Sequence, residues 1–223
     1  MGLKVKVLDH PYIQAILTVL RNKDTKQIEF RKSLVRMGRA FGLEMIKDFE
    51  TEEVYVETPL GVKAKGLKIK GVDKVVIITV LRAAWPMVEG LIKIFPQARQ
   101  GIISARRVEE KGMTPNGRFD VEVSYARIPN ISSDDTVILV DPMVATGSTM
   151  ETILRKVVEK GKARRYAIVS VIATPHAIER LSEVCDELGI DAVMYTASID
   201  PKLNDKGYIV PGLGDAGDRA FGG

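Results

Sequence analysis

Residues 137–149, Val-Ile-Leu-Val-Asp-Pro-Met-Val-Ala-Thr-Gly-Ser-Thr, lead from a short apolar stretch into a carboxylate and a loop of small residues. The aliphatic residues 137–140 predict a strand that is buried on both faces of a sheet, with Asp141 at its carboxyl end. After the loop, residues 151–160 carry apolar side chains at helical spacing. The segment therefore predicts a strand, a loop and a helix from an α/β protein.

The loop at residues 146–149, Thr-Gly-Ser-Thr, lies where the predicted helix begins. Free backbone N–H groups and the helix dipole make a helix N-terminus an anion site, and Gly147 lets the chain approach a ligand closely. The Asp141 carboxylate can accept hydrogen bonds from sugar hydroxyls but would repel a phosphate. This pairing suggests a ligand that is both sugar and phosphate, although an ordinary strand, helix cap and helix fits the local pattern equally well.

The middle and the second half of the chain alternate predicted strands with predicted helices. We predict strands at residues 75–81, 101–105, 137–140, 166–172 and 192–195, and helices at residues 87–94, 151–160 and 175–188. This alternation indicates an α/β fold with a mostly parallel, twisted sheet flanked by helices. Ligands of such sheets bind beyond the carboxyl ends of the strands.

Two further regions flank the predicted sheet within a single domain of residues 1–223. Pro11 opens an apolar pattern at helical spacing, so the first element is expected to be a helix and residues 1–50 an N-terminal helical part. Gly38 and Gly42 in that part allow close helix packing. Residues 54–56 and 62–69 predict strands around a turn, and residues 106–128 predict a flexible β-hairpin that flanks a cleft.

Composition places the chain among ordinary globular proteins. Of its 223 residues 45% are hydrophobic and 28% charged, and its net charge of +4 permits nucleic-acid binding without indicating it. The single cysteine, Cys185, excludes an intramolecular disulfide and a multi-cysteine zinc site, and its spacing predicts a buried helix face rather than a nucleophile. Two histidines are too few for a three-histidine metal site. No apolar run has the length of a signal peptide or a membrane span, so we expect an intracellular protein.

Three arginines follow predicted strands and face the same end of the sheet as Asp141. Arg82 follows residues 75–81, and Arg106 and Arg107 follow residues 101–105. A guanidinium group suits phosphate because it donates two parallel hydrogen bonds without losing its charge. Each arginine alone is better explained by a surface ion pair, for example with Glu109 or Glu110. Together and beside Asp141, they favour an anion site.

A glycine-rich run near the end of the chain, residues 212–217, formally matches the G-x-G-x-x-G dinucleotide fingerprint. Only six residues follow Gly217, so the long helix that the fingerprint needs cannot fit. The run is either a structural turn or, as we favour, a loop that offers backbone amide and carbonyl groups to a flat polar ligand.

Read together, residues 141–149, the segment Tyr-Thr-Ala-Ser-Ile-Asp at 195–200, Leu203-Asn204 and residues 207–222 resemble the uracil phosphoribosyltransferase family, within the type I phosphoribosyltransferases. The resemblance extends from His10 to the end of the chain. It implies a glycosyltransferase of pyrimidine salvage that converts uracil and 5-phospho-α-D-ribose 1-diphosphate (PRPP) to UMP and diphosphate. The run Tyr-Ile-Val-Pro-Gly-Leu-Gly-Asp-Ala-Gly-Asp-Arg at residues 208–219 is its most specific part.

The resemblance also implies a function for individual residues. Arg82, Arg107 and Asp215 are the implied catalytic residues, and Asp215 is a candidate for assisting loss of the uracil N1 proton. PRPP would bind to these three residues and to Asp141, Pro142, Met143, Val144, Ala145, Thr146, Gly147, Ser148 and Thr149. Uracil would bind largely to backbone groups, at Ile209, Gly214, Asp215 and Ala216 within the uracil-binding part, residues 195–223.

Cofactor, partners and assembly follow from the same resemblance. Mg²⁺ is expected to arrive with PRPP and water rather than in a protein cage, so we expect no metal ligands from the chain. Members of the family are dimers or tetramers, and some respond to GTP as activator or CTP as inhibitor. The basic residues 31–39 could bind such an effector, although a solvated helix face explains them better. We expect a cytoplasmic protein with no stable nucleic-acid partner and no membrane contact.

The chain departs from the family pattern at two positions, and one alternative function is compatible with its sequence. Residues 83–86 read Ala-Ala-Trp-Pro where bacterial relatives usually read Ala-Gly-Leu-Gly, so the diphosphate loop is expected to be stiffer. Ser148 replaces a glycine that is common at this position. The alternative is a PRPP-sensing regulator that binds nucleic acid without converting uracil, against which the uracil-like terminal loop argues.

Overall fold

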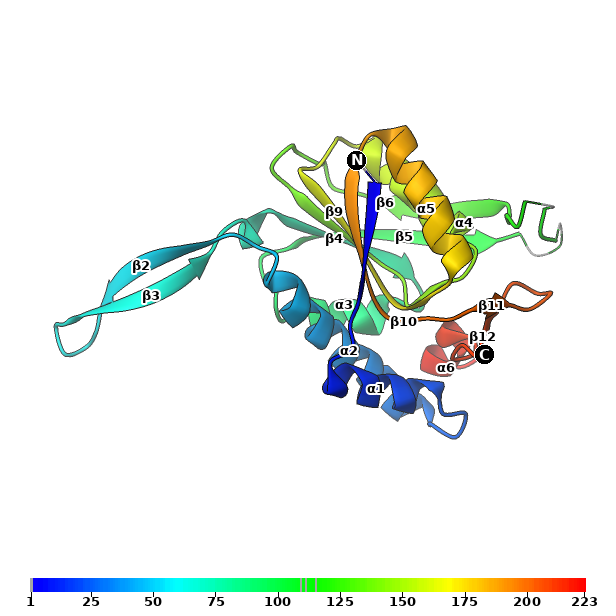
Figure 1. Ribbon diagram of the computed structural model, residues 1–223, viewed down its shortest axis with the longest axis horizontal. Helices are drawn as coiled ribbons and strands as arrows, with labels where there is room; N and C mark the ends of the chain where they lie inside the picture. Colours follow the sequence, from blue (N-terminus) through cyan, green and yellow to red (C-terminus); the bar gives the residue numbers. More distant parts are fainter. Residues whose placement is uncertain (1, 109, 111, 115) are drawn as a thin grey trace.

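The computed structural model describes every residue except Met1, Glu109, Lys111 and Pro115. An eight-stranded sheet forms its centre, with the main path β1-β10-β9-β7-β4-β5-β6 and the short β8 beside β9. Neighbouring strands run parallel except for β5 and β6, which are antiparallel. The predicted fold class, a mostly parallel sheet flanked by helices, is therefore confirmed (Figure 1).

The sheet strands agree with the predicted positions and extend several of them. Their bounds are β1 Gly2–Val7, β4 Val75–Leu81, β5 Arg99–Arg107, β6 Val121–Arg127, β7 Thr136–Val140, β8 Met143–Val144, β9 Arg165–Ala173 and β10 Asp191–Ile199. All residues of β7 and all but the last of β4 are buried, as expected for strands covered on both faces. This burial explains why both strands are continuous aliphatic runs.

The prediction that a helix comes first is wrong, because β1 precedes it and pairs with β10. Residues 3–7, Leu-Lys-Val-Lys-Val, alternate in the manner of an edge strand, but their partner lies almost 190 residues away. The two lysines on this edge strand are exposed, which is a common protection against pairing with another sheet.

Helices cover both faces of the sheet (Figure 1). On one face lie α1 Pro11–Arg21, α2 Gln27–Ile46 and α3 Trp85–Leu91; on the other lie α4 Ser148–Val158 and α5 Pro175–Leu188. Gly38 allows α2 to approach α3 closely, because a Cβ at this position would lie 2.0 Å from the Met87 carbonyl oxygen. The close packing expected from Gly38 is confirmed.

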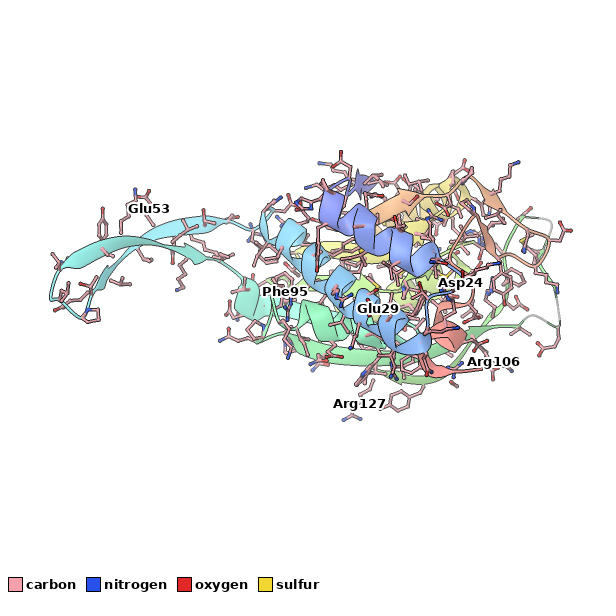
Figure 2. The ribbon with its side chains drawn as sticks, turned by 90° about the horizontal axis from the view of Figure 1, so that it is seen from below. Asp24, Glu29, Glu53, Phe95, Arg106 and Arg127 are labelled. Atoms are coloured by element: carbon pink, nitrogen blue, oxygen red, sulfur yellow. The ribbon has the colours of Figure 1, made fainter. Side chains whose placement is uncertain are left out.

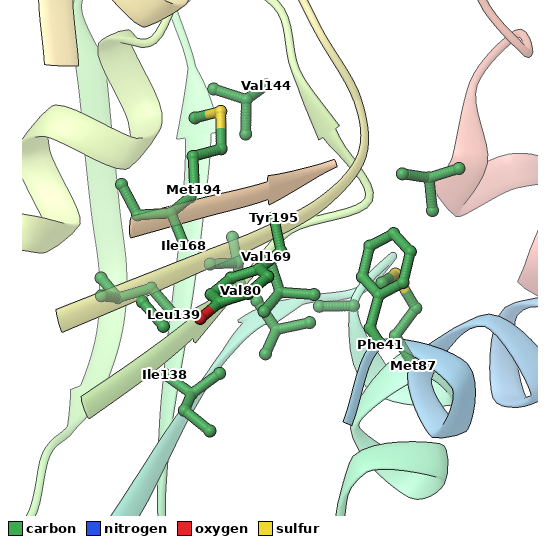
Figure 3. Close-up of a cluster of buried hydrophobic side chains, with 14 of the residues drawn as sticks. Phe41, Val80, Met87, Ile138, Leu139, Val144, Ile168, Val169, Met194 and Tyr195 are labelled. Atoms are coloured by element: carbon green, nitrogen blue, oxygen red, sulfur yellow. The ribbon is translucent and has the colours of Figure 1, made fainter. Parts of the chain in front are cut away.

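The buried core joins the sheet to α2 and α3. Figure 3 shows Ile138 and Leu139 of β7, Ile168 and Val169 of β9, and Met194 and Tyr195 of β10 in one cluster, with Phe41 and Met87 extending it toward the helices. Cys185 is also fully buried on α5, which confirms its predicted position on the inner helix face.

Two hairpins and a terminal segment extend from this body. The arm formed by β2 Thr51–Glu57 and β3 Lys63–Ile69 projects from one end, and the β5–β6 hairpin extends at the opposite end (Figure 1). The arm is joined to β4 by the short turn of helix η1 Val72–Lys74. The terminal segment contains β11 Lys202–Leu203, β12 Ile209–Val210 and α6 Ala216–Phe221. Among the described residues, no helix is both long and apolar enough to cross a membrane.

Candidate active site

A cleft of about 250 Å³ opens at the carboxyl ends of β4, β5 and β7, where parallel sheets usually bind ligands. The terminal segment closes its other side. The lining residues come from four parts of the chain: Val80, Leu81 and Ala83; Ala105, Arg106 and Arg107; Asp141, Met143, Val144, Ala145, Thr146, Gly147, Thr149 and Met150; and Gly207, Tyr208, Gly214, Asp215, Ala216 and Gly217. The topology thus joins the two motifs that the sequence singled out.

Asp141 lines the cleft and directly follows β7. Burial raises the pKa of Asp141 to about 6, against the opposing effects of the Met143 backbone N–H and the charge of Arg107. The Met143 N–H donates to Asp141 Oδ1 at 3.2 Å, which orients the carboxylate. A desolvated carboxylate in this position is a strong acceptor for ligand hydroxyl groups.

The small-residue loop turns directly into α4. Gly147 has a φ of 79° and occupies the N-cap position, a backbone conformation that glycine adopts without strain. Thr149 lines the cleft, whereas the hydroxyls of Thr146 and Ser148 are buried 3.1 Å from each other. The loop therefore offers the N-terminus of α4 to the cleft, as an anion site requires.

The three arginines have different partners. Arg107 lines the cleft, donates to the Gly207 carbonyl at 3.1 Å, and lies over the Phe119 ring at 4.9 Å. Arg106 also lines the cleft but pairs with Glu122 of β6 at 2.7 Å, and Figure 2 shows it at the end of the molecule opposite the arm. Arg82 is not a lining residue.

Arg82 is turned toward the terminal helix. Its Nη2 lies 2.9 Å from Asp218 Oδ1 in an exposed ion pair, although its neighbours Leu81 and Ala83 line the cleft. The pair is half exposed on both sides, so it is weak and exchangeable.

The terminal loop is held by an ion pair that the sequence did not reveal. The Asp200 carboxylate is buried and accepts from Arg21 of α1 at 2.6 Å, from Ser198 at 2.7 Å, and from the Gly212 N–H at 2.9 Å. Burial opposes ionisation, but these hydrogen bonds and the Arg21 charge outweigh it and lower the pKa of Asp200. The ionised carboxylate therefore fixes the loop to α1 and to the end of β10.

A short helix, α6, begins inside the glycine-rich run at Ala216, and the sequence did not predict it. Asp215 is the N-cap of α6, and its carboxylate accepts from the Asp218 N–H at 2.9 Å. The helix has six residues, too few for the dinucleotide fingerprint. The run is instead a loop whose Gly214, Asp215, Ala216 and Gly217 face the cleft.

The structure brings most, but not all, of the predicted ligand residues to one cleft. Those at the surface of the cleft are Arg107, Asp141, Met143, Val144, Ala145, Thr146, Gly147, Thr149, Gly214, Asp215 and Ala216. Arg82, Pro142, Ser148 and Ile209 do not line it, and Ile209 is buried behind the terminal loop. Tyr208 lines the cleft without having been predicted, because its position depends on how the terminal segment folds back.

Comparison with known proteins identifies the family. Residues 7–223 match the family model described as uracil phosphoribosyltransferase. The uracil phosphoribosyltransferase of Pyrobaculum islandicum is 55% identical over 97% of this chain and 98% of its own length, and that of Pyrococcus furiosus is 52% identical over 96% and 88%. A solved structure, the AQ2163 protein from Aquifex aeolicus, superposes with a TM-score of 0.85 at 31% identity over 98% of both chains. The chain therefore belongs to the uracil phosphoribosyltransferase family.

Proposed function

We propose that this protein transfers the 5-phosphoribosyl group of PRPP to N1 of uracil, which yields UMP and diphosphate. The observation that carries the proposal is the single cleft shared by the Asp141 loop and the Gly214–Ala216 segment. Family membership supports the same reaction, since the relatives named above are uracil phosphoribosyltransferases. The position of the cleft supports a donor and an acceptor that bind side by side.

In this proposal the donor occupies the sheet side of the cleft. Asp141 accepts hydrogen bonds from the ribose hydroxyls, and residues 142–149 surround the 5′-phosphate at the N-terminus of α4. Arg107 and, after release from Asp218, Arg82 donate to the diphosphate. Their charges stabilise the departing diphosphate, which lowers the barrier to forming a cationic anomeric carbon.

The acceptor occupies the terminal-loop side. Gly214, Asp215 and Ala216 line the cleft and would offer their backbone groups to the base, while Ile209 is buried in the same terminal segment. These groups would hold the uracil ring so that N1 faces the anomeric carbon, and proximity of this kind accounts for much of the rate of two-substrate transfers. No residue needs to form a covalent intermediate.

We propose Mg²⁺ as the cofactor. Three of the polar residues that line the cleft, Asp141, Asp215 and Thr149, carry oxygen donors of the kind that Mg²⁺ prefers. The described residues contain no group of three or more histidine, cysteine, aspartate or glutamate side chains that could hold a metal. An ion bound through diphosphate oxygens and water suits this donor set, and its charge would offset that of the leaving group.

The decisive assay incubates the purified protein with PRPP, Mg²⁺ and isotopically labelled uracil, and separates the nucleotides formed. Labelled UMP and an equal amount of diphosphate are expected, with no product from adenine, guanine or hypoxanthine. Diphosphate release without a base, or only with purines, would contradict the proposal. The alternative, a PRPP-sensing regulator of nucleic acid, predicts PRPP binding with no UMP.

The proposed catalytic role of Asp215 can be separated from its structural role. Asparagine caps helices about as well as aspartate, so Asp215→Asn keeps the α6 cap but removes the charge. We expect turnover to fall at least tenfold while the melting temperature stays within about 2 °C, a loss within the range typical for a general base. Asp215→Ala removes both functions and serves as the comparison. Wild-type turnover in Asp215→Asn would exclude Asp215 as a base.

We also propose that the protein is a cytoplasmic homodimer or homotetramer, with GTP as a candidate activator and CTP as a candidate inhibitor. The basic residues of α2, among them Arg31, Lys32 and Arg36, lie with the half-exposed Trp85 around a shallow surface pocket. Arg36 already pairs with Glu29 at 2.5 Å, which supports the simpler explanation of a solvated face. Initial rates with and without each nucleotide, and light scattering of the purified protein, test these points.

A further inference from the structure

Arg180 of α5 is a buried arginine that lies directly behind the α4 loop. Only 5% of the residue is exposed, yet among the described residues no carboxylate lies within ion-pair distance of its guanidinium group. Its Nη1 donates to Ser148 Oγ at 2.8 Å, and its Nη2 donates to the Asn116 carbonyl at 2.9 Å. A buried guanidinium group whose described hydrogen-bond partners are all neutral is costly unless an anion balances it.

Ser148 connects this arginine to two parts of the active site. Its Oγ accepts from the Phe119 N–H at 3.1 Å, which fixes the base of the β5–β6 hairpin, and lies 3.1 Å from Thr146 Oγ1. Ser148 is itself the first residue of α4. The hydroxyl thus joins Arg180, the hairpin and the loop that faces the cleft. A glycine at this position would not provide this connection.

The loop packs tightly on α5 at this point. A Cβ on Gly147 would lie 3.3 Å from Arg180 Cδ and 3.4 Å from the Ala177 Cα. His176 is also close, with its Nε2 3.3 Å from both the Arg180 Nη2 and the Gly117 carbonyl oxygen. Burial lowers the pKa of Arg180 and Arg118 adds to this effect, whereas Glu151 and Glu183 oppose it. The positive end of the α4 dipole lies at the same loop, so the guanidinium group and the helix N-terminus both favour an anion there.

We propose that Arg180 is a positioning residue for the 5′-phosphate of the substrate. Its charge acts from behind residues 146–149 and strengthens phosphate binding there, and its hydrogen bonds hold the hairpin to the same loop through Ser148 and Asn116. The inference rests on the proposed function, because it assigns the phosphate that this loop binds. Arg180 is not among the residues that line the cleft, so it acts through the loop.

The test compares a ligand that carries the phosphate with one that lacks it. UMP and uridine are titrated into wild-type protein, Arg180→Met, Arg180→Lys and the control Arg164→Met, which removes an exposed arginine paired with Glu50. Arg180→Met should weaken UMP binding at least tenfold but uridine binding less than twofold, and should raise KM for PRPP far more than KM for uracil. Arg180→Lys should recover most of the UMP affinity because it keeps the charge. The control should match wild type.

Other outcomes overturn the inference, and they can be distinguished from failure of the proposed function. If Arg180→Met weakens the binding of UMP and of uridine equally, or leaves both unchanged, the arginine has only a structural role. UMP synthesis by the wild type would still uphold the proposed reaction in that case. If wild-type protein neither makes UMP nor prefers UMP to uridine, both proposals fail. If Arg180→Met does not fold, the UMP affinities of Arg180→Lys and Ser148→Gly decide whether Arg180 supports phosphate binding. Ser148→Gly keeps the loop N–H and should weaken UMP binding about twofold to fivefold, and unchanged binding would exclude the route through Ser148.

Discussion

At the scale of single residues, Asp141 shows a conflict between stability and ligand binding. Its pKa rises from 3.8 to about 6 in the folded protein because burial disfavours the charged form. The contribution of Asp141 to the free energy of unfolding is thus fully present below pH 3.8, where the group is protonated in both states, and is lost as pH rises through about 6. We expect Asp141→Asn to raise the free energy of unfolding at pH 8, by at most about 3 kcal/mol, and to change it little at pH 4. The same variant should lose PRPP affinity.

Urea denaturation of ligand-free protein at pH 4 and pH 8 measures this difference. Asp134→Asn is the matched control, because Asp134 is an exposed carboxylate just before the same strand. Equal changes at the two pH values, or a loss of stability at pH 8, would show that burial of the Asp141 charge is not costly. Natural active sites commonly sacrifice stability in this way.

At the scale of elements, the packing of α2 on α3 supports the part of the chain that contains Arg82. Gly38→Ala would place a methyl group 2.0 Å from the Met87 carbonyl oxygen, and backbone atoms cannot easily move away. Overpacking typically costs about 1–3 kcal/mol, which exceeds the gain of up to about 1 kcal/mol from replacing glycine by alanine in a helix. We therefore expect a lower melting temperature in thermal denaturation. Gly42→Ala on the same helix should cost less, because the atoms nearest to its new methyl group all belong to the Ile94 side chain, which can move more easily than backbone. The reverse order would contradict this packing argument.

Also at the scale of elements, local sequence patterns predicted the helices, strands and loops whose structure depends on neighbouring residues. The bounds of α5, Pro175–Leu188, agree with the prediction because Pro175 and the left-handed Gly189 mark its two ends. The strand β1 was missed because its pairing with β10 is remote in sequence. The Asp141 loop was predictable as one continuous segment. The Arg21–Asp200 pair and the Ser148–Arg180 contact were not, since each joins residues that only the fold brings together.

At the scale of the whole molecule, a few buried or half-buried carboxylates join distant parts of the chain and should control its response to acid. Asp48 links the end of α2 to Lys6 and Tyr195, Asp135 accepts from Arg99 and the Ser132 N–H, and Asp200 holds the terminal loop. Burial opposes ionisation of each, but hydrogen bonds outweigh it and lower all three pKa values.

A lowered pKa contributes stability that is present above the unfolded value of 3.8 and is lost as pH falls through the lower folded value. The free energy of unfolding should therefore decrease as pH falls below about 4, whereas ionisation of Asp141 decreases it as pH rises from about 4 to about 6, so these groups together favour a maximum of stability near pH 4. Urea denaturation from pH 2.5 to pH 8 measures this profile.

Asp200→Asn should lower the free energy of unfolding by roughly 2–4 kcal/mol at pH 7, because it removes one charge of a buried pair, and should make the decrease of this free energy in acid shallower. A profile that is flat below pH 4, or one that Asp200→Asn shifts down equally at every pH, would mean that these ion pairs do not couple the terminal loop to the stability of the whole fold.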